Sequence, residues 1–202
     1  MLIRCHRSRV SSRVAVVART KEAMTSIITV CTGNICRSPA AELLLQEYLG
    51  GAAAVSSAGT HALVGRGIPA EMLMALDGDG IDGRGHAAQQ YSSDLARSFD
   101  LVICMTAEHR RWAVSEAPFA LRKTFMLTEL QEAARRGAAL TGSSLEERVA
   151  SVPDAVSSIR PLLAGVSLAD VPDPYMRSQA VYDATYATLK SLIGEVVEWV
   201  KG

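Results

Sequence analysis

Apolar and β-branched residues first cluster at residues 27–30, a run that is typical of a buried parallel strand. A loop containing Gly33 follows, and apolar residues then recur at helical spacing as far as Gly50. Ser38 is a preferred helix N-cap and Pro39 a preferred first helical residue, so we expect the helix to begin at this pair. The opening stretch therefore predicts a strand, a loop and a helix in immediate succession.

The same alternation continues along the chain. Three further runs have strand character, at residues 53–57, 99–105 and 123–127. Three stretches have apolar residues at helical spacing, namely after Pro69, at 106–115 and at 179–201. This order predicts an α/β fold, a single domain with a twisted parallel four-stranded sheet and helices on both faces. In such sheets the functional site lies at the carboxyl ends of the strands, where the loop after Val30 falls.

Two stretches depart from this alternation. Residues 131–165 are rich in Ala, Ser and Arg, and we interpret them as a largely helical insertion of unknown function. Residues 1–24 carry six Lys or Arg against one acid, and we expect a disordered basic extension before a folded domain at 25–202. Their composition also resembles a transit peptide or a poor secretory signal, and translation starting at Met24 would remove residues 1–23.

The overall composition fits an ordinary globular enzyme or binding module, with 49% hydrophobic residues and a net charge of zero. No basic surplus points to nucleic acid, and no apolar run approaches the roughly 18 residues that a membrane span needs. The four cysteines, Cys5, Cys31, Cys36 and Cys104, lack the spacing of a disulfide framework or a zinc site. We therefore expect reduced thiols, a cytoplasmic location, and neither metal nor cofactor.

The loop at residues 31–38, Cys-Thr-Gly-Asn-Ile-Cys-Arg-Ser, has the chemistry of a thiolate nucleophile on an anion-binding loop. Backbone N–H groups and the N-terminus of the following helix supply positive potential, and Arg37 supplies a planar fork suited to two phosphate oxygens. Ser38 can donate to the sulfur of Cys31. Gly33 and Asn34 tolerate left-handed backbone, which turns consecutive N–H groups into one nest. The Gly-Lys-Ser/Thr ending of a nucleotide-binding loop is absent.

Phosphoryl transfer to a thiolate also needs an acid that protonates the leaving oxygen. Asp173 is the best candidate, because the prolines at 172 and 174 stiffen its loop and hold the carboxylate out from the fold. Without the cysteine loop, the same residues would be read as a solvated Asp-Pro turn. Tyr175 could flank an aromatic substrate or simply pack on the surface.

Together these stretches resemble the low-molecular-weight protein tyrosine phosphatase family, over roughly residues 26–130 and 166–201. The segment 30–42 resembles the family's phosphate-binding loop and following helix, 56–60 the segment after its second strand, and 173–175 its general-acid loop.

The resemblance implies a role for each matching residue. Cys31 attacks phosphorus and forms a phosphocysteine, Arg37 holds the equatorial oxygens, and Asp173 is the general acid and base. Phosphate and substrate binding falls to a larger group: Thr32, Gly33, Asn34, Ile35, Cys36, Ser38, Leu63 and Tyr175. Ser57 and His86 join Asn34 and Ser38 in a polar network that supports the loop. Cys36 can pair reversibly with Cys31 and protect it from over-oxidation.

Three features depart from the family pattern. The usual arginine after the histidine is missing, since Ala87 and Ala88 follow His86. Many family members have an aromatic residue at the wall of the substrate cleft, whereas this chain has the segment 61–65, in which Leu63 is the expected wall residue. This variant is similar to the branch paired with bacterial tyrosine kinases of polysaccharide export. The stretch 131–165 lengthens the chain between nucleophile and acid.

We predict that the protein hydrolyses phosphotyrosine in proteins. A bacterial tyrosine kinase is one candidate partner, and the sequence does not indicate the oligomeric state. Protein arginine phosphatase is the main alternative. That branch tends to have threonine at the position of Ile35 and phenylalanine at the position of Tyr175. Arsenate reductase would need further cysteines near residues 80–95, which are absent. A silent phosphoprotein-binding module usually loses the nucleophile, the arginine or the acid, and all three are present here.

Overall fold

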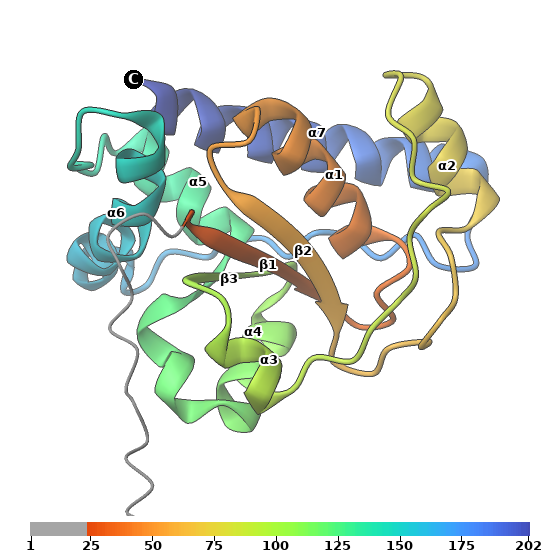
Figure 1. Ribbon diagram of the computed structural model, residues 1–202, viewed down its shortest axis with the longest axis horizontal. Coiled ribbons are helices and arrows are strands. Elements are labelled where there is room, and N and C mark those ends of the chain that lie inside the picture. The colour runs from red at the N-terminus through yellow and green to blue at the C-terminus, as the bar shows by residue number, and fades with distance from the viewer. Residues whose placement is uncertain (1–23) are drawn as a thin grey trace, which may run out of the picture.

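The computed structural model describes residues 24–202, so the predictions for the basic extension lie outside the described residues except at Met24 (Figure 1). Four strands form one sheet in the order β2-β1-β3-β4: β1 (Ser26–Cys31), β2 (Ala54–Gly59), β3 (Leu101–Cys104) and β4 (Thr124–Met126). Every pairing is parallel. The predicted four-stranded parallel α/β fold is therefore confirmed.

Seven α-helices connect and cover the strands in the described part of the chain: α1 (Arg37–Leu49), α2 (Ala70–Asp77), α3 (Ser93–Arg97), α4 (Ala107–Glu116), α5 (Leu127–Arg135), α6 (Leu145–Ile159) and α7 (Gln179–Lys201). Two 3₁₀ turns, η1 (Pro118–Lys123) and η2 (Arg160–Leu163), complete the description. The bounds of α7 agree with the prediction, whereas the short helix α3 was not predicted. None of the described helices has both the length and the apolar character needed to cross a membrane.

The sheet separates two cores, because successive strand residues point to opposite faces. Ile27 and Ile103 belong to the larger core, which α1, α5, α6 and α7 close. Ile28 and Val102 belong to the smaller core, which residues of α3, α4 and η1 close. Figure 1 shows α1 and α7 on one side of the sheet and α3 and α4 on the other. Strands buried on both faces explain why the sequence shows continuous apolar runs there.

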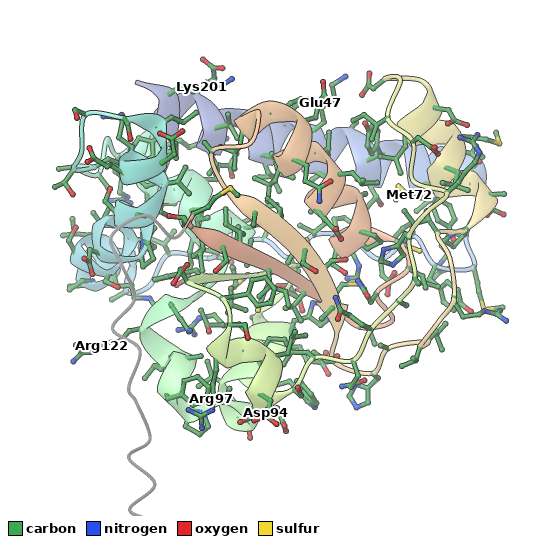
Figure 2. The ribbon with its side chains drawn as sticks, in the orientation of Figure 1. Glu47, Met72, Asp94, Arg97, Arg122 and Lys201 are labelled. Atoms are coloured by element: carbon green, nitrogen blue, oxygen red, sulfur yellow. The ribbon has the colours of Figure 1, made fainter. Side chains whose placement is uncertain are left out.

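Side chains divide between core and surface as this layering requires (Figure 2). Met72 of α2 is fully buried in the larger core. Asp94 and Arg97 of α3, with Arg122 of η1, are exposed on the outside of the smaller layer. These three charged side chains therefore lie on the solvent-facing side of α3 and η1, away from the sheet.

Helix α1 begins earlier than the Ser38–Pro39 pair suggested. Its N-cap is Cys36, which makes no side-chain capping bond, and Arg37 is already helical. The prediction of Ser38 as the N-cap is therefore wrong, because its hydroxyl is occupied elsewhere in the site. The other end is as predicted: Gly50 adopts the left-handed conformation (φ 56°) that ends many helices.

The stretch 131–165 is helical where it is regular, containing the end of α5, all of α6 and η2. Val149 and Val152 of α6 lie in the larger core with Val196 and Val200 of α7. Residues 131–165 therefore extend the larger core rather than forming a separate unit. Their status as an insertion stays a prediction.

A mostly buried charge cluster ties this stretch to the sheet. Glu129 of α5 contacts the guanidinium of Arg110 on α4 (3.4 Å) and that of Arg160 on η2 (3.3 Å). The same carboxylate accepts the Met126 N–H at 2.7 Å, and Arg160 also lies 4.4 Å from the centre of the Phe125 ring. One carboxylate thus compensates two half-buried cations.

We expect Glu129→Ala to lower the free energy of unfolding by about 2 kcal/mol, because two arginines would lose their shared counter-charge. Urea denaturation measures the change. Glu132→Ala is the matched control on the same helix, since it breaks only a surface pair with Arg136 and should cost less than about 0.5 kcal/mol. Equal losses in the two variants would contradict the account.

Candidate active site

One pocket of about 170 Å³ opens at the carboxyl end of β1, where the topology places the site. Nine of the predicted site residues line it: Cys31, Thr32, Gly33, Ile35, Cys36, Arg37, Leu63, Asp173 and Tyr175. His61, which had no predicted role, lines it as well. The loop at residues 31–37 and the loop that contains Asp173 (residues 170–175, hereafter the acid loop) lie more than 130 residues apart in the chain but share one cavity.

The loop at residues 31–37, hereafter the nucleophile loop, is held by its carbonyl groups. Cys31, Thr32 and Gly33 accept the N–H groups of Thr60, His61 and Leu63 at 2.9–3.0 Å. By contrast, the N–H groups of residues 32–37 donate to no acceptor within the described part of the chain. With the carbonyls bound by the scaffold, a run of amide donors is left for an anion at the N-terminus of α1.

Asn34 and Gly59 make this arrangement possible, rather than the predicted pair of Gly33 and Asn34. Asn34 is left-handed (φ 55°) as expected, whereas Gly33 is not among the residues with positive φ. The position that must be a glycine is Gly59, at the end of β2. A Cβ there would lie 2.5 Å from the Thr32 carbonyl oxygen, so the loop can approach β2 only over a glycine.

Asn34 is the fully buried centre of the network behind the loop. Its amide nitrogen donates to Ser38 Oγ (3.0 Å) and Ser57 Oγ (2.8 Å), and its amide oxygen accepts the Gln89 N–H (2.8 Å). His86 Nε2 donates to its backbone carbonyl at 2.7 Å. The predicted support residues therefore converge on Asn34.

The network continues to Glu42 on α1, a residue to which the sequence assigned no role. Ser57 donates to Glu42 at 2.6 Å, which leaves the serine oxygen free to accept from Asn34. Burial raises the pKa of the Glu42 carboxyl, while the Ser57 hydrogen bond and nearby His86 act in the opposite direction.

Ser38 connects this network to Cys31, the predicted nucleophile. Its Oγ lies 3.0 Å from Cys31 Sγ and 3.3 Å from the Ala58 carbonyl oxygen, and it accepts from Asn34. The single hydroxyl hydrogen can point either at the Ala58 carbonyl or at the sulfur, and a thiolate would favour the second orientation. This use of Ser38 is the reason that it does not cap α1.

Arg37 joins the two loops of the site. Its side chain is buried, with one terminal nitrogen 2.7 Å from Asp173 Oδ2 and the other 3.3 Å from the Val171 carbonyl oxygen. Its Nε is buried and has no partner within the described residues. The guanidinium therefore retains a donor beside the loop amides while it fixes the position of the acid loop.

The two loop cysteines differ in their surroundings. Burial raises the pKa of the Cys36 thiol to about 12, although a hydrogen bond with Tyr182 acts in the opposite direction. Cys36 is therefore a neutral thiol at pH 7. Cys104 is fully buried in β3, outside the pocket, as its position in a strand predicted.

His109 is the functional candidate that the sequence did not reveal. It is buried, and its Nε2 lies 2.8 Å from Thr32 Oγ1. Burial and the nearby Arg37 lower its pKa to about 4 against the opposing effect of Asp173 and Asp170, so the imidazole is neutral at pH 7. A lone histidine on a helix gives no sequence signal, because only the fold brings it to Thr32.

No group of three or more residues in the described part of the chain is arranged to hold a metal ion. The chemistry that the pocket offers is that of a thiol, a guanidinium, a carboxyl group and a row of amides.

Comparison with known proteins gives consistent matches over most of the chain. The family model described as low molecular weight phosphotyrosine protein phosphatase matches residues 26–141. Low molecular weight protein-tyrosine-phosphatase Etp of Escherichia coli K12 is 31% identical over 87% of this chain and 93% of its own. Wzb of Vibrio vulnificus in complex with benzylphosphonate has a TM-score of 0.64 at 26% identity, covering 89% of this chain and 99% of its own. YwlE arginine phosphatase from Geobacillus stearothermophilus has a TM-score of 0.66 at 26% identity, covering 88% and 93%.

Replacing Asn34 separates the backbone and side-chain contributions to the loop. Asn34→Gly loses the three side-chain hydrogen bonds but keeps the left-handed backbone, and we expect it to lower the free energy of unfolding by about 2 kcal/mol. Asn34→Ala should lose about 1 kcal/mol more, because a Cβ penalises that conformation. Urea denaturation of the three proteins tests this, and an alanine variant as stable as the glycine variant would refute the backbone contribution.

Proposed function

The chain belongs to the low molecular weight phosphotyrosine protein phosphatase family, and we propose that it hydrolyses phosphotyrosine in proteins through a phosphocysteine intermediate. The observation that carries this proposal is the 2.7 Å contact between Arg37 and Asp173 beside Cys31, in one pocket. It brings together a nucleophile, a permanent cation for the phosphoryl oxygens and an acid for the leaving group.

In the first step, Cys31 Sγ attacks phosphorus as a thiolate that Ser38 stabilises by donating its hydroxyl hydrogen. The bond from phosphorus to the tyrosine oxygen breaks, and Asp173 gives that oxygen its proton. The N–H groups of residues 32–37 and the Arg37 guanidinium hold the equatorial oxygens, on which negative charge is concentrated.

In the second step, Asp173 acts as a base. Its carboxylate takes a proton from water, the water oxygen attacks phosphorus, and the bond from phosphorus to sulfur breaks. Inorganic phosphate leaves and the Cys31 thiolate is regenerated. Asp173 suits both steps because half of its side chain is exposed at the pocket mouth, where leaving group and water arrive.

Aromatic substrates are favoured by the side chains that line the pocket above the loop. Leu63, Tyr175 and Ile35 present apolar and aromatic surface on which a phenyl ring can pack. Ile35 offers no acceptor for the N–H groups of a guanidinium. The similarity to a Wzb structure that holds benzylphosphonate supports the same preference.

The substrate we propose is a phosphotyrosine-bearing protein, a bacterial tyrosine kinase being one candidate. A reducing compartment such as the cytoplasm suits a catalytic thiol. We also propose that Cys36 protects Cys31. After a peroxide oxidises the Cys31 thiolate to a sulfenic acid, attack by the Cys36 sulfur would release water and form a reducible disulfide.

Two substitutions test the assigned roles on a phosphotyrosine peptide. Cys31→Ser should abolish turnover, because an alkoxide is not available at neutral pH. Asp173→Asn should lower kcat by about 100-fold or more, and its loss in kcat/KM should be smaller on an aryl phosphate whose leaving group needs no proton. Cys104→Ala, which removes a buried thiol outside the pocket, is the control and should retain turnover. Activity in Cys31→Ser would disprove the proposal.

Arginine phosphatase is the second candidate, and the similarity to YwlE favours it. Turnover of phosphotyrosine and phosphoarginine versions of one peptide decides between them. We expect kcat/KM to be at least about tenfold higher for phosphotyrosine, the difference that one well-packed apolar group can make. A preference for phosphoarginine would overturn the substrate assignment but leave the phosphocysteine chemistry intact.

A further inference from the structure

The first turn of α4 contacts both loops of the active site. On one side, His109 reaches Thr32 of the nucleophile loop at 2.8 Å. On the other, the Ala107 N–H donates to Asp170 Oδ1 at 2.8 Å, three residues before the proposed general acid. Separate elements of the chain that must meet at one phosphorus atom are thus joined to a single turn.

The turn itself is firmly placed. The Thr106 side chain accepts the His109 N–H at 3.1 Å and so caps the helix. Directly before it, Met105 donates to Val30 of β1 at 3.0 Å and accepts the Val171 N–H at 2.9 Å. The helix therefore starts from the centre of the sheet, and its position follows that of β1 and β3.

On the nucleophile side, Thr32 is held at two points. Its carbonyl accepts from His61, and its hydroxyl is bound to His109. The Thr32 amide is the first of the unpaired N–H groups after Cys31. Fixing the side chain and the carbonyl leaves this amide little freedom to turn away from an oxyanion.

His109 is suited to a positioning role and not to proton transfer. It is 5% exposed, does not line the pocket, and its Nδ1 has no partner within the described residues. A buried imidazole that keeps one nitrogen unpaired carries a desolvation cost. If the side chain at this position only filled space, an apolar residue would do so without this cost. The hydrogen bond to Thr32 therefore accounts better for a histidine here.

We propose that the first turn of α4 positions the two halves of the active site: His109 fixes Thr32 of the nucleophile loop, and the Ala107 amide fixes Asp170 and thereby the acid loop. His109 and Asp170 are positioning residues. The inference rests on the proposed function, but its nucleophile half can be tested without turnover.

The nucleophile half is tested with inorganic phosphate binding by calorimetry, and with kcat/KM for an aryl phosphate. His109→Ala and Thr32→Val should each lower the phosphate affinity and kcat/KM by about tenfold, the contribution of one hydrogen bond. The double variant should also lose about tenfold, because both changes remove the same bond. His109→Gln, which keeps a side-chain nitrogen in reach of Thr32, should recover most of the loss.

The acid half is tested by the choice of leaving group. Asp170→Ala should lower kcat/KM, which reports only the step that forms the phosphocysteine, about tenfold for phenyl phosphate but little for dinitrophenyl phosphate, whose leaving group needs no proton. Phosphate affinity should not change. Asp170→Asn keeps a carbonyl oxygen for the Ala107 N–H and should restore the rate.

Glu108→Gln is the matched control, because Glu108 is exposed on the same turn and has no side-chain hydrogen bond or ion pair with the described residues of either loop; it should leave every value unchanged. A hundredfold loss in the double variant would show that His109 and Thr32 act independently and would overturn the nucleophile half. Unchanged phosphate affinity in His109→Ala and Thr32→Val would do the same, even if His109→Ala lowers the melting temperature. Equal losses of kcat/KM for both leaving groups in Asp170→Ala would overturn the acid half. If the wild type bound phosphate but hydrolysed no phosphate ester, the proposed function would fail while the His109–Thr32 result still stood.

Discussion

The active site depends on one buried asparagine in left-handed backbone. Asn34 has three side-chain hydrogen bonds and a fourth at its carbonyl, and these four bonds hold a non-glycine residue at φ 55°. Because the loop carbonyls are bound behind the loop, its amides remain available in front. The anion site is thus a consequence of how the backbone's own polar groups are paired.

The same logic extends to the acid. Arg37 bonds to Asp173 and to the Val171 carbonyl, and Val171 in turn bonds to Met105 at the start of α4. The acid loop is therefore attached to the sheet through backbone and to the nucleophile loop through a guanidinium. Such pre-organisation lets charge develop on a phosphoryl group without rearrangement of the site.

Much of this could be predicted from the sequence because local patterns determine it. Residues 27–30 and 101–104 are apolar on both faces, which is a property of central parallel strands, and α7 shows helical spacing over its whole length. Cys31, Arg37 and Asp173 could be proposed from the sequence because their chemistry demands neighbours of particular types, and all three line one pocket. What failed were inferences from local propensity where tertiary contacts decide: Ser38 favours an N-cap in isolation, but here its hydroxyl serves Cys31 and Asn34. Gly59 and His109 could not be recognised, since their reasons lie in contacts with Thr32 from distant elements.

In the proposed mechanism, phosphoryl transfer passes through the sulfur of Cys31. The most direct measurement is mass spectrometry of Asp173→Asn protein quenched during turnover of an aryl phosphate with a good leaving group. That variant lacks the base for the second step, so the account predicts a phosphoryl group on the peptide that contains Cys31. Turnover without any phosphorylated peptide, or a phosphoryl group located on another residue, would contradict it.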